Sequence, residues 1–212
     1  MAFAFPEGLA PEAYPLAWLV GSWRGEGVIA YPGITETPFV QDIVFDHDGG
    51  PYLRYESTIR VLEAEVPETV PEAWTADQPH DADAEPSSAS TEPSTSTEPD
   101  AEGRLAPGRI WSTETGYWRV SPERPEGLPE DRSAIEVMIA DPSGRMTLYL
   151  GVVGNGRVDL SSDAMVRTST SAEVTASNRL YGNVQGQLLW VWELAAFGQP
   201  LQSYASAKLD RL

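Results

Sequence analysis

Apolar and polar residues alternate with a period of two along most of this chain, in short runs separated by turn residues. Such alternation is typical of strands that bury one face. Leu16, Leu19 and Val20 recur at near-helical spacing ahead of the first strand, which predicts a short helix or 3-10 turn that plugs one end. The alternation predicts strands near residues 22–31, 38–46, 51–60, 109–120, 133–140, 145–152, 156–161, 163–169, 173–182, 187–195 and 202–210.

Three connections between these strands carry the glycine and asparagine chemistry of hairpin turns: residues 48–50, 141–144 and 154–156. Each such turn makes its flanking strands antiparallel neighbours. About ten short strands joined in this way favour an up-and-down barrel over a sandwich. We therefore predict an all-β fold, an antiparallel up-and-down β-barrel of about ten strands, in a single domain over residues 1–212.

The stretch GSWRGEG opens the first strand, although glycine has no side chain to pack and costs backbone entropy in a strand. With a period of two, Gly21, Trp23, Gly25 and Gly27 share one face, and the polar residues between them share the other. We expect Trp23 to fill the base of the barrel, between glycines that let the strands bend past it.

One segment does not fit the barrel. Between Val61 and Gly103 the chain has twelve Asp and Glu, no Lys or Arg, and a tract rich in Ser, Thr and Pro. Such a segment buries too little apolar surface to offset its ordering entropy. We predict a disordered acidic insertion over residues 63–103, with His80 as a solvated bystander. A phosphorylated tail or a docking segment are the alternatives.

The formal net charge of −18 argues against binding to nucleic acid phosphates or anionic membranes, although −12 of it lies in the insertion. The chain has no cysteine, which excludes disulfides, thiolate metal sites and Cys nucleophiles. Its first residues lack a basic segment followed by an apolar run, and no stretch approaches the roughly 18 apolar residues of a spanning helix. We expect a cytoplasmic protein, monomeric or homodimeric.

The sequence resembles the nitrobindins, which are haem-binding relatives of the fatty-acid-binding-protein barrels. The family motif GxWxGxG is matched by Gly21, Trp23, Gly25 and Gly27. Collinear blocks follow over residues 12–212, apart from the insertion: LAWLVGSWRGEG, FDHDGGPYLRYES, TETGYWR, LYLGVVGNGRVDLSSDA and RLYGNVQGQLLWVWELAAFGQPL. The resemblance implies haem b as cofactor and activity on nitric oxide and peroxynitrite.

Two positions depart from the family pattern. The resemblance implies an axial haem histidine in the last strand, shortly after GQPL, and a haem-contacting threonine in the turn after the first strand. This chain has Tyr204 and Gly33 at these places. His47, in FDHDGG, is expected to hydrogen-bond its own loop. We therefore expect no cofactor, no metal and no catalytic residue, and a lumen that is empty or holds an apolar small molecule.

Alternatives remain open. Alternation along the last strand would turn Tyr204 outward, and only the resemblance turns it inward. A tyrosinate haem ligand would need the phenol pKa of about 10 to fall by roughly three units, or about 4 kcal/mol. Arg54, Arg119 or Arg167 could supply that help from other strands. The second hypothesis is thus a peroxynitrite isomerase with tyrosinate or water ligation, and the third is an interaction protein that docks through its insertion.

Overall fold

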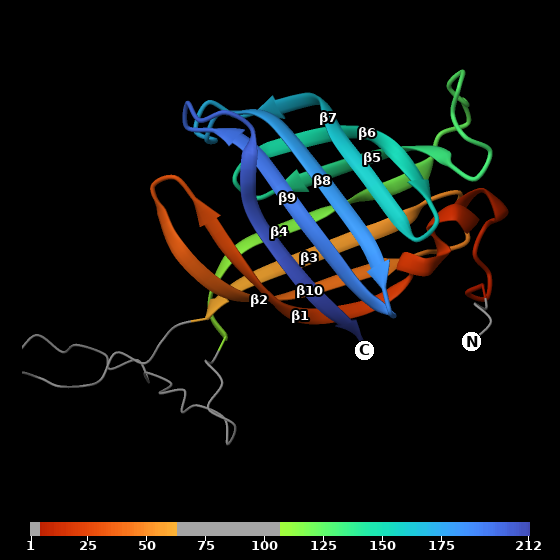
Figure 1. Ribbon diagram of the computed structural model, residues 1–212, viewed down its shortest axis with the longest axis horizontal. Coiled ribbons are helices and arrows are strands. Elements are labelled where there is room, and N and C mark those ends of the chain that lie inside the picture. Colours follow the sequence, from red (N-terminus) through yellow and green to blue (C-terminus); the bar gives the residue numbers. More distant parts are fainter. Residues whose placement is uncertain (1–4, 63–106) are drawn as a thin grey trace, which may run out of the picture. The chain divides into compact units, whose positions relative to one another are not determined.

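The computed structural model describes residues 5–62 and 107–212, so the predicted insertion at 63–103, with His80, lies outside the described residues. The described chain forms a closed antiparallel barrel (Figure 1). Its elements are the 3-10 helix η1 (Pro11–Leu19) and the strands β1 (Gly21–Tyr31), β2 (Ile34–Asp46), β3 (Leu53–Leu62), β4 (Pro107–Val120), β5 (Ser133–Asp141), β6 (Arg145–Gly154), β7 (Arg157–Arg167), β8 (Val174–Val184), β9 (Gln187–Ala196) and β10 (Gln202–Arg211).

Each strand pairs with its neighbours in the chain, and β1 pairs with β10 to close the barrel. The predicted up-and-down barrel is confirmed. Residues 156–161 and 163–169 were expected as two strands, but they form the single strand β7. Opposite β6, Leu148 faces Ala164 and Tyr149 faces Ser162, which leaves Asp163 as an extra residue. This bulge interrupts the alternation and resembles a turn in the sequence.

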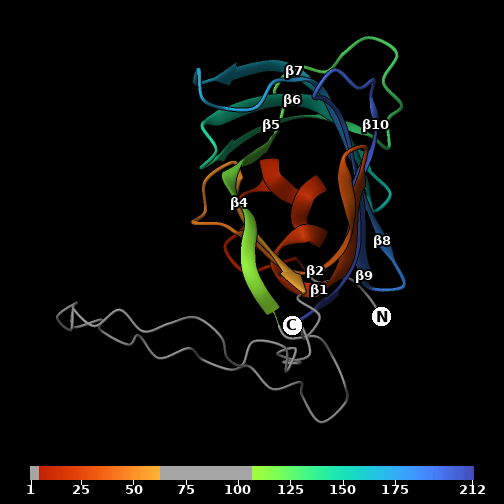
Figure 2. The same cartoon turned by 90° about the vertical axis from the view of Figure 1, so that its left-hand side faces the viewer.

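The helix η1 covers the end of the barrel at which β1 begins, which we call the closed end. Figure 2 looks into the barrel and shows η1 within the ring of strands. Leu16 and Leu19 of η1 are fully buried, and Trp23 is 1% exposed beside them. The indole Nε1 of Trp23 donates to the Leu19 carbonyl at 2.8 Å, and the Arg211 guanidinium lies 4.1 Å from the Trp23 ring centroid. The predicted helical plug is confirmed.

The glycines of β1 serve a close approach between strands at the seam where the barrel closes. A Cβ atom at Gly25 would lie 2.0 Å from the Lys208 carbonyl oxygen and 2.6 Å from the Leu209 Cα. A Cβ atom at Gly27 would lie 2.3 Å from the Ser206 carbonyl oxygen. Only glycine lets β1 and β10 pack this tightly, so contact with backbone, rather than bending alone, requires these residues.

The opposite end, which we call the mouth, is formed by the connections β1–β2, β5–β6, β7–β8 and β9–β10. Extra residues interrupt the strand pairing near this end, at Trp111, Asp163, Thr175 and Tyr204. Bulges of this kind bend a strand and re-aim a side chain, and they are frequent at barrel rims and next to functional sites. In residues 5–62 and 107–212, no helix has the length and hydropathy needed to cross a membrane.

Candidate functional site: a cavity at the mouth of the barrel

A cavity of about 400 Å³ lies at the mouth of the lumen. Trp111 and Glu114 of β4, Arg145 of β6, Trp192 of β9 and Tyr204 of β10 contribute to its wall. The lining also includes the apolar residues Ile34, Val174, Leu194, Ala196 and Phe197. The cavity thus combines aromatic and aliphatic surface with a few polar groups, which is the usual composition of a small-molecule site.

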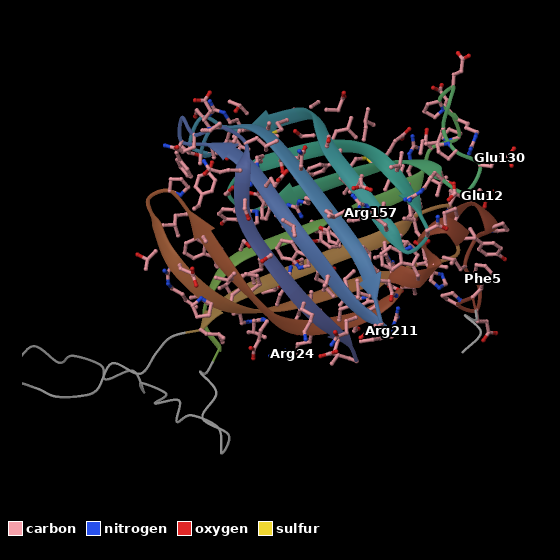
Figure 3. The ribbon with its side chains drawn as sticks, viewed as in Figure 1. Phe5, Glu12, Arg24, Glu130, Arg157 and Arg211 are labelled. Carbon is pink, nitrogen blue, oxygen red and sulfur yellow. The ribbon has the colours of Figure 1, made fainter. Side chains whose placement is uncertain are left out.

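A larger hollow of about 700 Å³ lies on the outer wall, over β8, β9, β10 and β1. Its lining includes Leu189 and Val191, which alternate along β9 with the buried residues Trp190 and Trp192 and therefore face away from the lumen. Arg157 borders the same hollow (Figure 3). We take the mouth cavity as the candidate site, because the buried polar side chains of the barrel converge there and not on the outer wall.

Trp111 and Tyr204 face the cavity because each is the extra residue of a bulge. Opposite β3, Ser112 pairs with Ile59 and Ile110 pairs with Arg60, so that Trp111 has no residue opposite it. On β10 the register likewise shifts between Ser203 and Ala205. Tyr204 is therefore turned toward the lumen together with the buried Ala205. Simple alternation, which would turn Tyr204 outward, is wrong here because the bulge adds one residue.

The phenol of Tyr204 is fixed by aromatic neighbours. The indole Nε1 of Trp111 donates a hydrogen bond to the Tyr204 hydroxyl oxygen at 2.8 Å. The Tyr204 ring packs edge-on against Trp192 and Tyr31, with centroids 5.0 and 5.8 Å away. Burial raises the pKa of Tyr204, although the Trp111 hydrogen bond acts in the opposite direction. The phenol is therefore uncharged at neutral pH.

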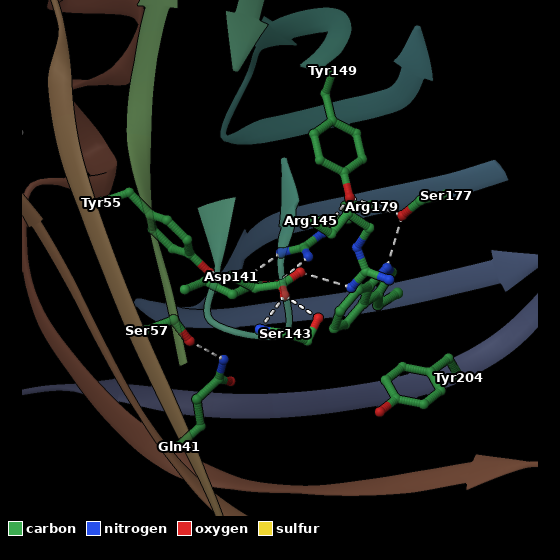
Figure 4. A network of polar contacts seen from close by, with 12 residues as sticks. Gln41, Tyr55, Ser57, Asp141, Ser143, Arg145, Tyr149, Ser177, Arg179 and Tyr204 are labelled. Atoms are coloured by element: carbon green, nitrogen blue, oxygen red, sulfur yellow. Dashed lines mark hydrogen bonds and ion pairs between the residues drawn. The ribbon is translucent and has the colours of Figure 1, made fainter. Parts of the chain in front are cut away.

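Glu114 of β4 lines the cavity and forms a buried ion pair with Arg179 of β8 behind it. Figure 4 labels Arg179 and the polar residues around it. Nη1 of Arg179 donates to Oε2 of Glu114 at 2.8 Å, and Nη2 donates to Oε1. The Tyr55 hydroxyl donates to the same Oε2 at 3.0 Å. The guanidinium also lies 4.0 Å from the centroid of the Trp192 ring, which places it on the face of the indole. Both charges are thus paired although both side chains are buried.

The pKa of Glu114 reflects two opposing effects. Burial raises it, because a low dielectric disfavours the charged carboxylate. The charge of Arg179 and the hydrogen bonds from Arg179 and Tyr55 lower it more, so the pKa lies below its ordinary value. Burial also raises the pKa of Tyr55 well above its usual range. Glu114 is therefore ionised at neutral pH, and Tyr55 is a neutral donor to it.

Further hydrogen bonds continue the network behind the ion pair. Tyr149 shares a hydrogen bond with Ser177 at 2.9 Å, and the Trp192 indole donates to the same Ser177 oxygen at 2.8 Å. Arg179 Nε donates to the Tyr149 oxygen at 3.2 Å. These bonds satisfy buried polar groups that would each be costly if left unpaired. They also hold the Trp192 ring, which forms part of the cavity wall.

A second ion pair lies on the cavity wall beside the β5–β6 turn. The Arg145 Nη2 atom is 2.9 Å from Oδ2 of Asp141, and both side chains are largely buried. The other carboxylate oxygen of Asp141 accepts from the Ser143 backbone N–H at 2.9 Å and from the Ser143 hydroxyl. The carboxylate thus organises the turn and holds Arg145 at the cavity.

Comparison with known proteins assigns the fold to a family. A family model described as the THAP4-like, heme-binding beta-barrel domain matches residues 12–211. The chain belongs to this family. A ferric nitrobindin-like protein from Beutenbergia cavernae is 40% identical over the full length of both chains. A peroxynitrite isomerase from Parafrankia sp. is 38% identical, with 96% of this chain and 81% of the relative covered. The resemblance to nitrobindins is confirmed.

A solved structure agrees with this assignment. The crystal structure of Rv2717c from M. tuberculosis matches this THAP4-like barrel with a TM-score of 0.64 and 26% sequence identity. The match covers 96% of this chain and 99% of that protein. The similarity therefore extends over the whole barrel and is not limited to a few strands.

The donor set of this THAP4-like barrel is a poor match for haem iron. In residues 5–62 and 107–212 the one histidine is His47, in the β2–β3 connection at the closed end, remote from the cavity. We expected His47 to hydrogen-bond its own loop, and its backbone N–H does donate to Oδ1 of Asp46 at 2.7 Å. Its ring Nδ1 has no partner in the described chain. The same residues contain no cluster of three His, Cys, Asp or Glu suited to a metal ion.

The other residues singled out in the sequence lie as follows. Gly33 is an exposed residue of the β1–β2 turn, with φ of +83°. The arginines considered as partners of Tyr204 are engaged elsewhere: Arg54 pairs with Asp46, Arg119 with Glu136 and Arg167 with Glu173, three carboxylates that do not line the cavity. The residues with charge at the cavity are instead Glu114, Asp141 and Arg145, with Arg179 behind them.

Sequence reasoning missed the Glu114–Arg179 pair, although a signal for it exists. Glu114 has the same parity along β4 as the buried Trp118, and Arg179 has the same parity along β8 as the buried Tyr181. Two opposite charges on inward-facing positions of one barrel predict a buried ion pair, since an unpaired charge there would be too costly. For Arg145 the sequence gives no such signal. It is the first residue of β6, directly after a turn, where alternation does not yet indicate which side chains face the lumen.

Proposed function

We propose that this member of the nitrobindin family binds a small, mainly apolar organic molecule at the mouth of its barrel and does not bind haem. The burial of Tyr204 carries this proposal, because it keeps the phenol neutral while Trp111 donates to the hydroxyl oxygen. Tyr204 stands where the resemblance implies the axial histidine, and its oxygen already accepts a hydrogen bond within the protein. A phenol oxygen can keep this bond and still bind iron, so ligation depends on whether the phenol loses its proton.

The electrostatics of the cavity support a neutral phenol. A tyrosinate would need its pKa lowered by roughly three units, which corresponds to about 4 kcal/mol. Nearby cations usually supply such help, but the two arginines whose charges act on Tyr204 both have carboxylate partners: Arg179 pairs with Glu114, and Arg145 with Asp141. Burial instead raises the pKa of Tyr204. Ligation of ferric haem by a tyrosinate is therefore disfavoured.

The dimensions and lining of the cavity support an organic ligand. Its volume of about 400 Å³ falls within the range of about 300–1,000 Å³ that is usual for small-molecule sites. Trp111, Trp192 and Phe197 provide aromatic surface on different sides of the opening. Such a lining favours a ligand with a flat apolar body, since aromatic rings bury large areas and prefer offset or edge-on contacts with other rings.

The alternative function is that of an enzyme acting on peroxynitrite, because several relatives at 31–38% identity carry the name peroxynitrite isomerase. That function would require haem bound through Tyr204 or through a water molecule. The two hypotheses differ in the ligand of the iron, so absorption spectroscopy separates them.

The test is a titration of the purified full-length protein with ferric haem, followed in the region of the Soret band. We expect no saturable shift for the wild-type protein and a histidine-type Soret band for Tyr204→His. Tyr204→Phe is the matched control, since it removes the hydroxyl and adds no ligand. Stoichiometric wild-type binding with a tyrosinate-type spectrum that Tyr204→Phe abolishes would overturn the proposal, and so would a water-ligated spectrum shared by both proteins.

A further inference from the structure

The two carboxylates on the cavity wall already have most of their acceptor capacity in use. Glu114 accepts hydrogen bonds from Arg179 on both carboxylate oxygens, and from Tyr55 on one of them. Asp141 accepts from Ser143 and contacts Arg145. Each carboxylate thus has three of its roughly four lone-pair sites in use, which leaves little acceptor capacity for a ligand that offers donors or a positive charge.

The donor groups, by contrast, have capacity left. The side chain of Arg145 is 14% exposed, and its one ionic contact in the described chain is the Nη2–Oδ2 contact to Asp141. A guanidinium carries five N–H donors. Apart from the contact to Asp141, these N–H groups have no acceptor within residues 5–62 and 107–212.

Tyr204 presents a second unused donor. Its oxygen accepts from Trp111, but its own O–H has no acceptor among the described residues. A phenol can donate and accept at the same time. Tyr204 and Arg145 both line the cavity, and they are close enough for the arginine charge to influence the tyrosine pKa. The cavity thus offers an O–H, and a guanidinium that contacts one carboxylate oxygen and has further N–H donors, next to aromatic surface.

From this imbalance we propose that the ligand is an organic carboxylate with a flat apolar body. The carboxylate accepts hydrogen bonds from Arg145 and from the Tyr204 hydroxyl, and the body packs against Trp111, Trp192 and Phe197. Charge-assisted hydrogen bonds from a guanidinium to a carboxylate are short and about twice as strong as neutral ones. A cation would be repelled by Arg145. This inference rests on the proposed function, because it names the ligand class of the same cavity.

Two probes with the same body and different head groups test the inference: 1-pyrenebutyrate and 1-pyrenebutanol. Each is titrated into the full-length protein, and binding is followed by quenching of tryptophan fluorescence. We expect the carboxylate to bind at least about tenfold more tightly than the alcohol, as one charge-assisted interaction supplies. Arg145→Met should abolish this preference and leave the affinity for the alcohol unchanged. Arg157→Met, on the outer wall, should retain the preference.

Tyr204→Phe provides a second variant if Arg145→Met does not fold, as judged by far-ultraviolet circular dichroism. This substitution should weaken the binding of 1-pyrenebutyrate severalfold and change the affinity for 1-pyrenebutanol by no more than about twofold. The reason is that a hydrogen bond from the phenol to a charged acceptor is about twice as strong as one to a neutral acceptor. Equal wild-type affinity for both probes, or an unchanged preference in Arg145→Met, would overturn the inference while leaving the proposed function in place. Failure of both probes to bind saturably would overturn the proposed function itself.

Discussion

Arg179 and Glu114 join two strands that are not neighbours in the barrel. β8 lies between β7 and β9, whereas β4 lies between β3 and β5. The bidentate ion pair between them therefore spans the lumen. On its closed-end side, Trp118 and Tyr181 pack edge to face with centroids 5.2 Å apart. On its mouth side lies the cavity. The pair therefore separates a solid aromatic core from a space that can receive a ligand.

The first prediction concerns the cost of breaking this pair. Glu114→Gln should lower the free energy of unfolding by about 3–5 kcal/mol, because it leaves the Arg179 charge buried without a counter-charge. Urea unfolding followed by tryptophan fluorescence measures the change. The matched control is Glu136→Gln, which breaks the more exposed pair with Arg119 and should cost only about 0–1 kcal/mol. Similar losses of unfolding free energy in the two variants would contradict the view that Glu114→Gln leaves the Arg179 charge buried and uncompensated.

The second prediction is a pH dependence with a defined sign. The pKa of Glu114 is lowered in the folded protein, so its stabilising effect is complete above the pKa of the unfolded chain. It is lost as the pH falls through the lower, folded pKa, because the unfolded chain binds the proton first. Below about pH 4.5 the wild-type protein should therefore lose stability more steeply than Glu114→Gln, which lacks this carboxylate. If the curves of unfolding free energy against pH run parallel for the wild-type protein and Glu114→Gln, Glu114 does not contribute to the pH dependence of stability.

The third prediction concerns the seam between β1 and β10. Gly25→Ala would place a Cβ atom 2.0 Å from the Lys208 carbonyl oxygen, and backbone cannot move aside cheaply. We expect a loss of roughly 1–3 kcal/mol in unfolding free energy. Gly182→Ala is the control, because a Cβ atom there has no neighbour within 4 Å. It should be neutral or stabilise by about 0.4–1 kcal/mol. Equal effects of the two substitutions would argue against close approach as the reason for glycine in β1.

The sequence pattern predicted the barrel because inward and outward residues alternate along its strands. Trp23 and its neighbouring glycines lie on the inner face of β1, as their parity requires. Parity fails wherever a bulge adds a residue, as at Asp163, Trp111 and Tyr204. Alternation alone therefore predicts that Tyr204 faces outward, although it faces the lumen. It also predicts two strands where the structure has the single strand β7.

The site was harder to predict than the fold, because its contacts link strands that are distant in the sequence. Trp111 meets Tyr204 across 93 positions, and Glu114 meets Arg179 across 65. Neither pair lies on neighbouring strands, so local patterning and strand order carry no direct signal for them. Only the closure of the barrel, together with the exact bulge positions, brings these side chains into contact.

The last prediction separates backbone strain from ligand binding at Phe197. This residue occupies the first position of the β9–β10 turn with φ of +54°, a conformation that is costly for an aromatic residue, and its side chain is 65% exposed at the mouth. Gln185 occupies the corresponding position of the β8–β9 turn at the closed end, with φ of +55°. In both connections the next residue is a glycine at positive φ, so Phe197 and Gln185 have a comparable left-handed strain, although the β9–β10 connection is longer.

Phe197→Gly and Gln185→Gly should therefore have the same effect on stability and different effects on binding. Each relieves about 1–2 kcal/mol of left-handed strain and incurs about 0.5–1 kcal/mol of extra backbone entropy, for a net gain of roughly 0.5–1 kcal/mol. Phe197→Gly should weaken 1-pyrenebutyrate severalfold, because an aromatic side of the cavity is lost, whereas Gln185→Gly should leave it unchanged. Unchanged affinity in Phe197→Gly would mean that Phe197 does not contact the ligand, and its strained turn would then need another explanation.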